Sequence, residues 1–221
     1  MTDTYSGEVS VGGPMDVRRL HGLTIAKMAV GPMDNNAYLL RCTTTGEGLL
    51  IDAANEADRL RELTRFEGPA VAGILTTHQH FDHWQALAET AADAEAAVYA
   101  GDEDADALPV AVDERLSHGD TLTVGDISLE VIGLRGHTPG SVAVLYRDPE
   151  GVPHLFTGDS LFPGGVGKTN SPEAFASLYT DVVERIFDVL PDDTWFYPGH
   201  GFDSTLGAER PHLAEWKARG W

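Results

Sequence analysis

The chain of 221 residues contains one cysteine and no long apolar run. Cys42 has no partner for an internal disulfide, and its strand-like surroundings predict a half-buried, unreactive thiol. No stretch of about 18 apolar residues is present, so a transmembrane helix is not expected. Residues 1–20 lack the charged-then-apolar pattern of a signal peptide, which favours a cytoplasmic location.

Basic residues are also scarce. The chain has 15 Lys and Arg against 35 Asp and Glu, which gives a formal net charge of −20. Such a charge repels phosphate backbones and anionic membranes, so neither nucleic acid nor a membrane is expected as a partner. Acidic runs such as "GDEDADA" (residues 101–107) are expected to form solvated surface. The oligomeric state is not readable from these features.

The order of elements predicts one α/β domain. The length supports a single core over residues 1–221, and no linker-like stretch divides it. Residues 1–20 are polar and glycine-rich, which predicts a loose leader, and residues 203–221 form a short C-terminal extension. Each half contains apolar strand-type runs followed by a segment with helical spacing. This order favours two sheets packed face to face with helices outside.

One helix has clear boundaries in the sequence. Ser171 is a suitable N-cap, Pro172 occupies the first helical position, and Pro191 ends the helix. Its apolar stripe is expected to consist of Phe175, Leu178, Val182, Ile186 and Val189.

The segment "TTHQHFDH" (residues 76–83) holds three histidines and an aspartate within six positions. His78 and His80 are two apart in an extended loop, so both imidazoles can face one ion. Asp82 and His83 come where a helix should begin, and the turn of the chain aims them at a different point. The loop therefore predicts ligands for two adjacent metal ions.

Three further polar residues follow predicted strands in the second half. His137 lies in "RGHTPGS", Asp159 in "FTGDSLF" and His200 in "FYPGHG". Loops at one edge of a sheet are where functional sites are commonly built, so these residues are expected to join the histidine loop. The other histidines match no motif and are expected at the surface or in turns: His21, His118, His154 and His212.

The motifs HxHxDH, GHTPGS, TGDSLF and PGHG occur in that order, and the likeness covers residues 23–203. Together they resemble the metallo-β-lactamase-fold hydrolase superfamily, which implies a four-layer αβ/βα sandwich. The resemblance implies that one metal ion is held by three histidines, namely His78, His80 and His137.

By the same resemblance, a second ion is held by Asp82, His83 and His200, and Asp159 bridges the two ions. Asp52, at the end of "LLIDAA", corresponds to an acidic residue that orients a ligand without binding metal. Zinc is the expected metal, and iron or manganese also suits a His and carboxylate set.

Two ions about 3.5–4 Å apart can share a water and lower its pKa, so that a bridging hydroxide forms at neutral pH. This chemistry favours hydrolysis of a thioester, ester, lactone or amide in a small-molecule substrate, and Asp82 can help to orient the nucleophile. "GDSLFPGGVGK" with "PGHG" is most similar to the glyoxalase II group, in which a lysine at the position of Lys168 contacts glutathione. That group carries a helical C-terminal extension, whereas only 21 residues follow His200 here.

Other functions stay open at this stage. A lactonase would use the same dinuclear chemistry, and a persulfide dioxygenase would use a single iron. The complete second ligand set argues against the dioxygenase. A structural zinc site usually contains cysteine ligands, and the predicted set has none. A secreted β-lactamase is disfavoured because no signal peptide is expected.

Overall fold

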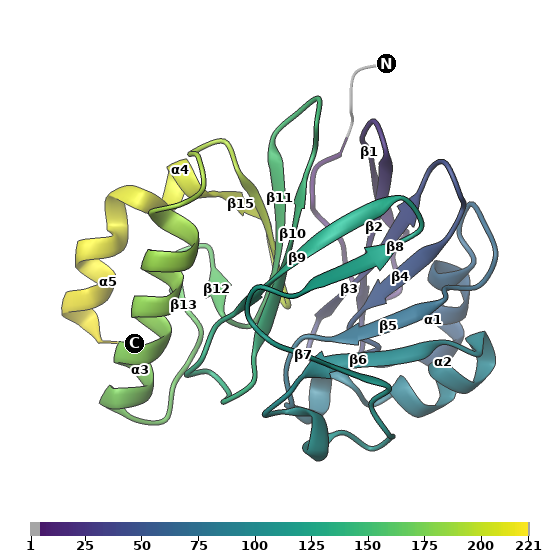
Figure 1. Cartoon of the computed structure of the whole chain (residues 1–221), viewed down its shortest axis with the longest axis horizontal. Helices are drawn as coiled ribbons and strands as arrows, with labels where there is room; N and C mark the ends of the chain where they lie inside the picture. Colours follow the sequence, from purple (N-terminus) through teal and green to yellow (C-terminus); the bar gives the residue numbers. More distant parts are fainter. Residues whose placement is uncertain (1–4, 221) are drawn as a thin grey trace.

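The computed structural model describes residues 5–220 and contains two large sheets stacked between two layers of helices (Figure 1). The predicted four-layer α/β architecture is confirmed. Figure 1 shows α1 and α2 outside one sheet and α3 and α5 outside the other. Within the described residues, no helix is long and apolar enough to cross a membrane.

The first sheet follows chain order and changes from antiparallel to parallel pairing at β4. Its strands are β1 (Asp16–Arg19), β2 (Leu23–Val30), β3 (Asn35–Cys42), β4 (Gly48–Ile51), β5 (Gly73–Thr76), β6 (Ala97–Gly101) and β7 (Glu114–Leu116).

The second sheet has the order β15-β14-β11-β10-β9-β8, and β11 and β14 are its parallel pair. Its strands are β8 (Thr121–Val124), β9 (Ile127–Gly133), β10 (Val142–Arg147), β11 (Pro153–Gly158), β14 (Trp195–Pro198) and β15 (Ser204–Thr205). A small hairpin is formed by β12 (Leu161–Phe162) and β13 (Gly165–Val166).

The helices are short and lie on the outer faces of the sheets. They are α1 (Ala57–Thr64), α2 (Leu87–Ala94), α3 (Pro172–Val182), α4 (Leu206–Glu209) and α5 (Leu213–Arg219). After α3 the chain continues through a π-helical turn, Val183–Phe187. Single 3-10 turns occur at Phe81–His83, Ala105–Ala107 and Arg210–His212.

The central strands of the first sheet, β2 to β5, are buried along their whole length because both of their faces are covered. In β3, Tyr38 and Leu40 point into the core between the sheets, whereas Ala37 and Leu39 point toward the layer of α1 and α2. A third cluster joins the outer face of the second sheet to α3 and α5, with Leu178 and Trp216 at its centre. The period-2 alternation of a strand thus divides one run of residues between two cores.

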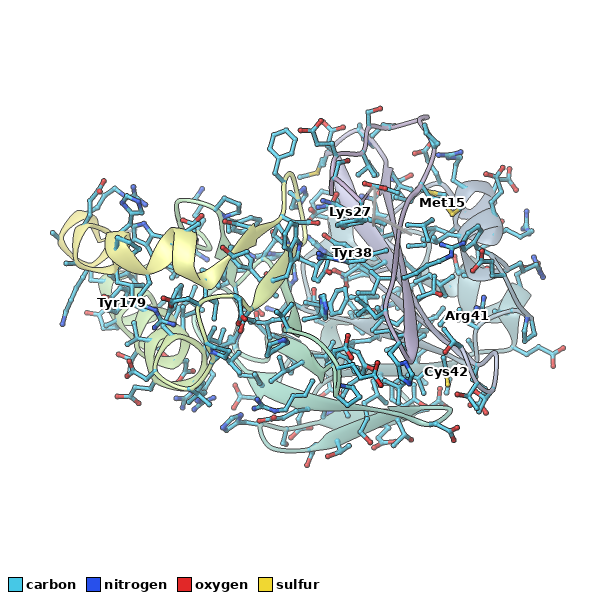
Figure 2. All side chains as sticks on the ribbon, turned by 90° about the horizontal axis from the view of Figure 1, so that it is seen from above. Met15, Lys27, Tyr38, Arg41, Cys42 and Tyr179 are labelled. Atoms are coloured by element: carbon cyan, nitrogen blue, oxygen red, sulfur yellow. The ribbon has the colours of Figure 1, made fainter. Side chains whose placement is uncertain are left out.

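Buried polar contacts also join the two halves. Figure 2 shows Lys27 of β2 and Tyr38 of β3 near the middle of the molecule. The Lys27 ammonium lies 2.7 Å from the Asp203 carboxylate, and both side chains are almost fully buried. Tyr38 donates to the Pro198 carbonyl at 2.6 Å. These contacts fix the segment that carries His200 against the first sheet.

Several sequence-based expectations are wrong in detail. The span expected to be a loose leader contains β1, and Tyr5 donates to Asp203 at 2.6 Å; residues 1–4 lie outside the described residues. Cys42 and His154 are fully buried, because both lie on strands that are covered on both faces. The helix expected to run to Pro191 ends at Phe187, so Val189 lies in the following turn and is 59% exposed.

Candidate metal centre

Five loops that leave the carboxyl ends of strands supply the predicted metal ligands and Asp52. Strand direction explains why they meet. β4 and β5 are parallel, so Asp52 and the histidine loop leave the first sheet at the same edge. β11 and β14 are parallel, so Asp159 and His200 also share an edge. β9 and β11 are both antiparallel to β10, which brings the His137 loop there too.

The first donor group consists of His78, His80 and His137, whose ligand atoms lie within 4.8 Å of one another. The Nε2 atom of His78 lies 3.1 Å from the Nδ1 atom of His80. The ring centroids of His80 and His137 are 4.5 Å apart. Burial, together with the neighbouring imidazoles, holds the pKa of His78 well below its usual value, so this ring is neutral and can offer a lone pair.

The second donor group consists of Asp82, His83 and His200, and it also lies within 4.8 Å. The 3-10 turn Phe81–His83 aims the first two side chains inward. An Asp82 carboxylate oxygen lies 3.5 Å from the Nε2 atom of His83 and 3.3 Å from that of His200. The two halves of the HxHxDH motif thus belong to different donor groups.

Asp159 lies between the two groups. One of its carboxylate oxygens is 3.4 Å from the Nε2 atom of His83, and the other is 3.7 Å from that of His137. The second oxygen is also 3.6 Å from His200. Burial raises the pKa of Asp159, but the surrounding imidazoles, with His83 foremost, lower it more. The carboxylate is therefore charged and faces both groups.

Hydrogen bonds fix which imidazole nitrogens face the centre. The Nδ1–H group of His137 donates to the Lys168 carbonyl at 2.7 Å, and that of His200 donates to the Met33 carbonyl at 2.9 Å. The Nδ1–H group of His83 donates to Asp52 at 2.8 Å. Each bond leaves the Nε2 atom directed inward, as a metal-binding histidine requires.

Three inward-facing atoms have no hydrogen-bond partner within the described residues although they are buried. They are the Nε2 atoms of His83 and His137 and the Oδ1 atom of Asp159. Buried polar atoms of a folded protein are nearly always satisfied, so unpaired ones that converge on a single space need an explanation. The donor set fits divalent metal ions, which would satisfy all three atoms.

Asp52 is hydrogen-bonded to two residues in or beside the donor groups. One carboxylate oxygen accepts from the Thr77 amide at 2.8 Å, and the other accepts from the Thr77 hydroxyl at 2.9 Å and from His83. The Thr77 hydroxyl is also 3.0 Å from the Nδ1 atom of His78. Burial lowers the pKa of His83, but Asp52 and Asp159 raise it more, to about 10. His83 therefore carries a proton on its Nε2 atom at neutral pH, and a metal ion bound there would displace that proton.

Two glycines of the motifs are required by close packing. A Cβ atom on Gly199 would overlap the carboxylate of Asp159 and approach the His83 ring to 2.7 Å. A Cβ atom on Gly167 would overlap the main-chain carbonyl of Asp159. These glycines let neighbouring loops touch behind the ligands.

Sequence reasoning missed two residues of the site's surroundings. Asn35, which reads as part of a turn, begins β3 and donates from its side-chain amide to Asp82 at 2.9 Å. Asp104, which was expected on solvated acidic surface, is fully buried behind the first donor group. No local signal distinguishes Asp104 from the exposed acids beside it, so this expectation is wrong for that residue.

The Lys168 side chain is exposed on the loop after β13, and only its carbonyl is hydrogen-bonded to a site residue, His137. Phe81 is 56% exposed beside Asp82, and Trp84 is half-buried and donates to the Gln79 carbonyl. Phe202 is 66% exposed two positions after His200. Phe202 also lines a cavity of about 290 Å³, together with Val9, Ser10, Ala29, Asp34, Asn36 and Gly201.

The sequence profile of the metallo-beta-lactamase superfamily matches residues 30–200, a span that includes every residue of both donor groups. The chain belongs to the metallo-beta-lactamase superfamily. Members named as hydroxyacylglutathione hydrolases are among its relatives. The one from Polaromonas sp. (strain JS666 / ATCC BAA-500) is 34% identical over 169 residues, which cover 76% of this chain. The matched part of the present chain covers 62% of that relative's length.

Other members match over nearly their full length. The probable metallo-hydrolase YqgX of Bacillus subtilis (strain 168) is 30% identical over 202 residues, which cover 83% of this chain and 93% of the relative.

Solved structures of the superfamily superpose well. The structure of TTHA1623 in a di-iron-bound form is 33% identical in sequence and superposes with a TM-score of 0.67. The match covers 83% of this chain and 96% of the TTHA1623 chain. ETHE1 from Myxococcus xanthus is 25% identical with a TM-score of 0.74, covering 88% and 84%.

Proposed function

We propose that this protein is a dinuclear metal-dependent hydrolase whose substrate is a small thioester, as in the glyoxalase II group. The observation that carries the proposal is the arrangement of two three-residue donor groups on either side of Asp159. The unpaired inward-facing atoms of His83, His137 and Asp159 support it, since two cations would satisfy them.

The family and the names of the relatives indicate a metal-dependent hydrolase. His78, His80 and His137 would hold one ion, and Asp82, His83 and His200 the other, with Asp159 bridging. Zinc is the proposed metal, and the di-iron form of TTHA1623 makes iron a realistic substitute. Two bound ions would supply an activated water and an electrophile that polarises a carbonyl.

The chain's own residues supply orientation. Asn35 donates to the Asp82 oxygen that also faces His83 and His200, which fixes the carboxylate beside the second donor group. From this position Asp82 can accept from a nucleophile and orient it. Asp82 is therefore the proposed catalytic residue. The exposed ring of Phe81 beside it gives an apolar surface for the substrate, and the Lys168 ammonium is the proposed contact for an anionic group.

A hydrolysis panel on purified protein tests the proposal. The panel contains lactoylglutathione, other acyl thioesters, an acyl-homoserine lactone and a β-lactam, and the metal content is measured alongside. We expect about two ions per chain and hydrolysis of a thioester that Asp82→Ala and His80→Ala each reduce by at least 1000-fold. Asp58→Ala, on the exposed side of α1, is the matched control and should not change the rate.

Different results separate the competing functions. A metal-loaded protein that is inactive on every thioester but cleaves the lactone would contradict the substrate and preserve the dinuclear site. One iron per chain, with oxygen uptake on glutathione persulfide, would replace the hydrolase with the dioxygenase. Metal binding by His80→Ala at the wild-type affinity and amount would contradict the site itself.

A further inference from the structure

Asp104 is a buried carboxylate that neither the motifs nor the proposed chemistry uses. It follows β6 in the run "GDEDADA" and has no exposed surface, whereas Asp102 and Asp106 beside it are exposed at the side chain. A buried carboxylate is costly unless hydrogen-bond donors surround it. Its partners therefore indicate what it does.

Those partners lie in two different loops. One carboxylate oxygen accepts from the Gln79 amide at 2.9 Å and from the Thr138 hydroxyl at 2.5 Å. The other oxygen accepts from the Gly140 amide at 2.7 Å. Gly140 is a glycine because a Cβ atom there would overlap the main chain of Asp104. The carboxylate is thus surrounded by donors in a close-packed setting.

These donors are adjacent in sequence to the histidines of the first donor group. Gln79 lies between His78 and His80, and Thr138 directly follows His137. One side chain therefore ties together the two loops, one from each sheet, that carry all three histidines. Within the described residues, the hydrogen bonds of the Asp104 carboxylate go to Gln79, Thr138 and Gly140 and not to Asp82, His83 or His200.

We propose that Asp104 is the positioning residue of the first metal site, which sets the distance between the His78–His80 loop and the His137 loop. The inference rests on the proposed two-metal function and adds a division of labour to it. Asp52 contacts His83 directly, whereas Asp104 acts through the backbone and Thr138 on the first group alone. Hydrogen-bonding groups behind metal ligands typically change metal affinity by 10–100-fold.

Two variants, each lacking one ligand, allow metal binding to be measured at one site at a time. In His200→Ala the remaining intact group is the first one, and in His80→Ala it is the second. Zinc affinity is measured in each background by competition with a chromophoric chelator. Adding Asp104→Asn should weaken zinc binding 10–100-fold in the His200→Ala protein and less than 3-fold in the His80→Ala protein. Asp106→Asn is the matched control from the same acidic run and should have no effect in either.

A milder pair of variants covers the case in which Asp104→Asn does not fold. Thr138→Val removes one hydroxyl donor at nearly constant shape, and Thr138→Ser keeps it. The valine variant should weaken zinc binding about 3–10-fold in the His200→Ala background only, and the serine variant should leave it unchanged.

The outcomes distinguish this inference from the proposed function. Equal weakening in both backgrounds, or in neither, would overturn the positioning role while leaving two metal sites in place. A wild-type protein that takes up no zinc, iron or manganese would overturn both proposals.

Discussion

At the scale of single residues, the motif side chains could be read from the sequence and their supports could not. His78, His80 and Asp82 stand out because their spacing is local, and the structure brings them together with the distant histidines. Asn35 and Asp104 act on residues 47 and 25 or more positions away. Only the folded chain places such partners side by side, so no sequence pattern marks them.

Gly199 gives a test at this scale. Gly199→Ala should weaken metal binding at least 10-fold, because the added methyl overlaps the Asp159 carboxylate and pushes it out of line. Metal content after dialysis against a weak chelator measures the effect. Gly165→Ala is the control, since its methyl would meet only the flexible end of Arg219. Equal metal retention in both variants would contradict the packing argument.

His154 predicts a pH dependence of stability. Burial, with a smaller contribution from Arg18, lowers the pKa of His154 to about 3. The unfolded chain binds this proton below about pH 6.5 and the folded protein does not, so stability falls as the pH drops from about 6.5 toward 3. Above about pH 6.5 the histidine is neutral in both states and the effect vanishes.

The variant His154→Asn tests this pH dependence, because the asparagine side chain cannot be protonated and can still accept a hydrogen bond from Tyr197. The free energy of unfolding is measured by urea titration in the presence of EDTA. Between pH 7.5 and pH 4.5 it should fall by roughly 2–3 kcal/mol more for the wild type than for the variant. The same loss in both proteins would show that another group controls the acid sensitivity.

At the scale of elements, the residue at which a helix begins follows from local chemistry, whereas the set of residues that the helix buries does not. Ser171 caps α3 as predicted, and its side chain accepts from the Ala174 amide at 3.1 Å. The apolar stripe continues to Ile186, but the helical segment ends at Phe187, and Val189 is exposed in the turn after it. Where the segment ends depends on how the helix packs against its sheet.

The cap predicts a modest stability effect. Ser171→Ala should lower the free energy of unfolding by about 1 kcal/mol, since one amide at the start of α3 loses its acceptor. Ser171→Asp keeps an acceptor and should restore most of that loss. Urea titration of the three proteins measures the differences, and an unchanged midpoint for the alanine variant would show that solvent replaces the cap.

At the scale of the whole molecule, charge is the dominant feature. The net charge of −20 is distributed over a chain of 221 residues, and the repulsion opposes the compact state. Raising KCl from 20 mM to 0.5 M screens this repulsion and should raise the melting temperature by a few degrees, which corresponds to about 1–2 kcal/mol. Calorimetry on the metal-free protein measures the change. A constant or falling melting temperature would show that local ion pairs outweigh the overall charge.

The sequence by itself predicted two sheets packed face to face with helices outside and, through four motifs that resemble a known family, seven candidate metal ligands. These follow from local spacing, hydrophobic period and four motifs, which act over a few residues each. The tertiary structure alone decided which nitrogen of each imidazole faces inward, and that Asp104 and Lys27 are buried. It also decided that Tyr5 packs against the body of the fold. These outcomes depend on contacts between segments far apart in the chain, because burial and hydrogen-bond partners are fixed only when strand ends from both sheets meet at one edge.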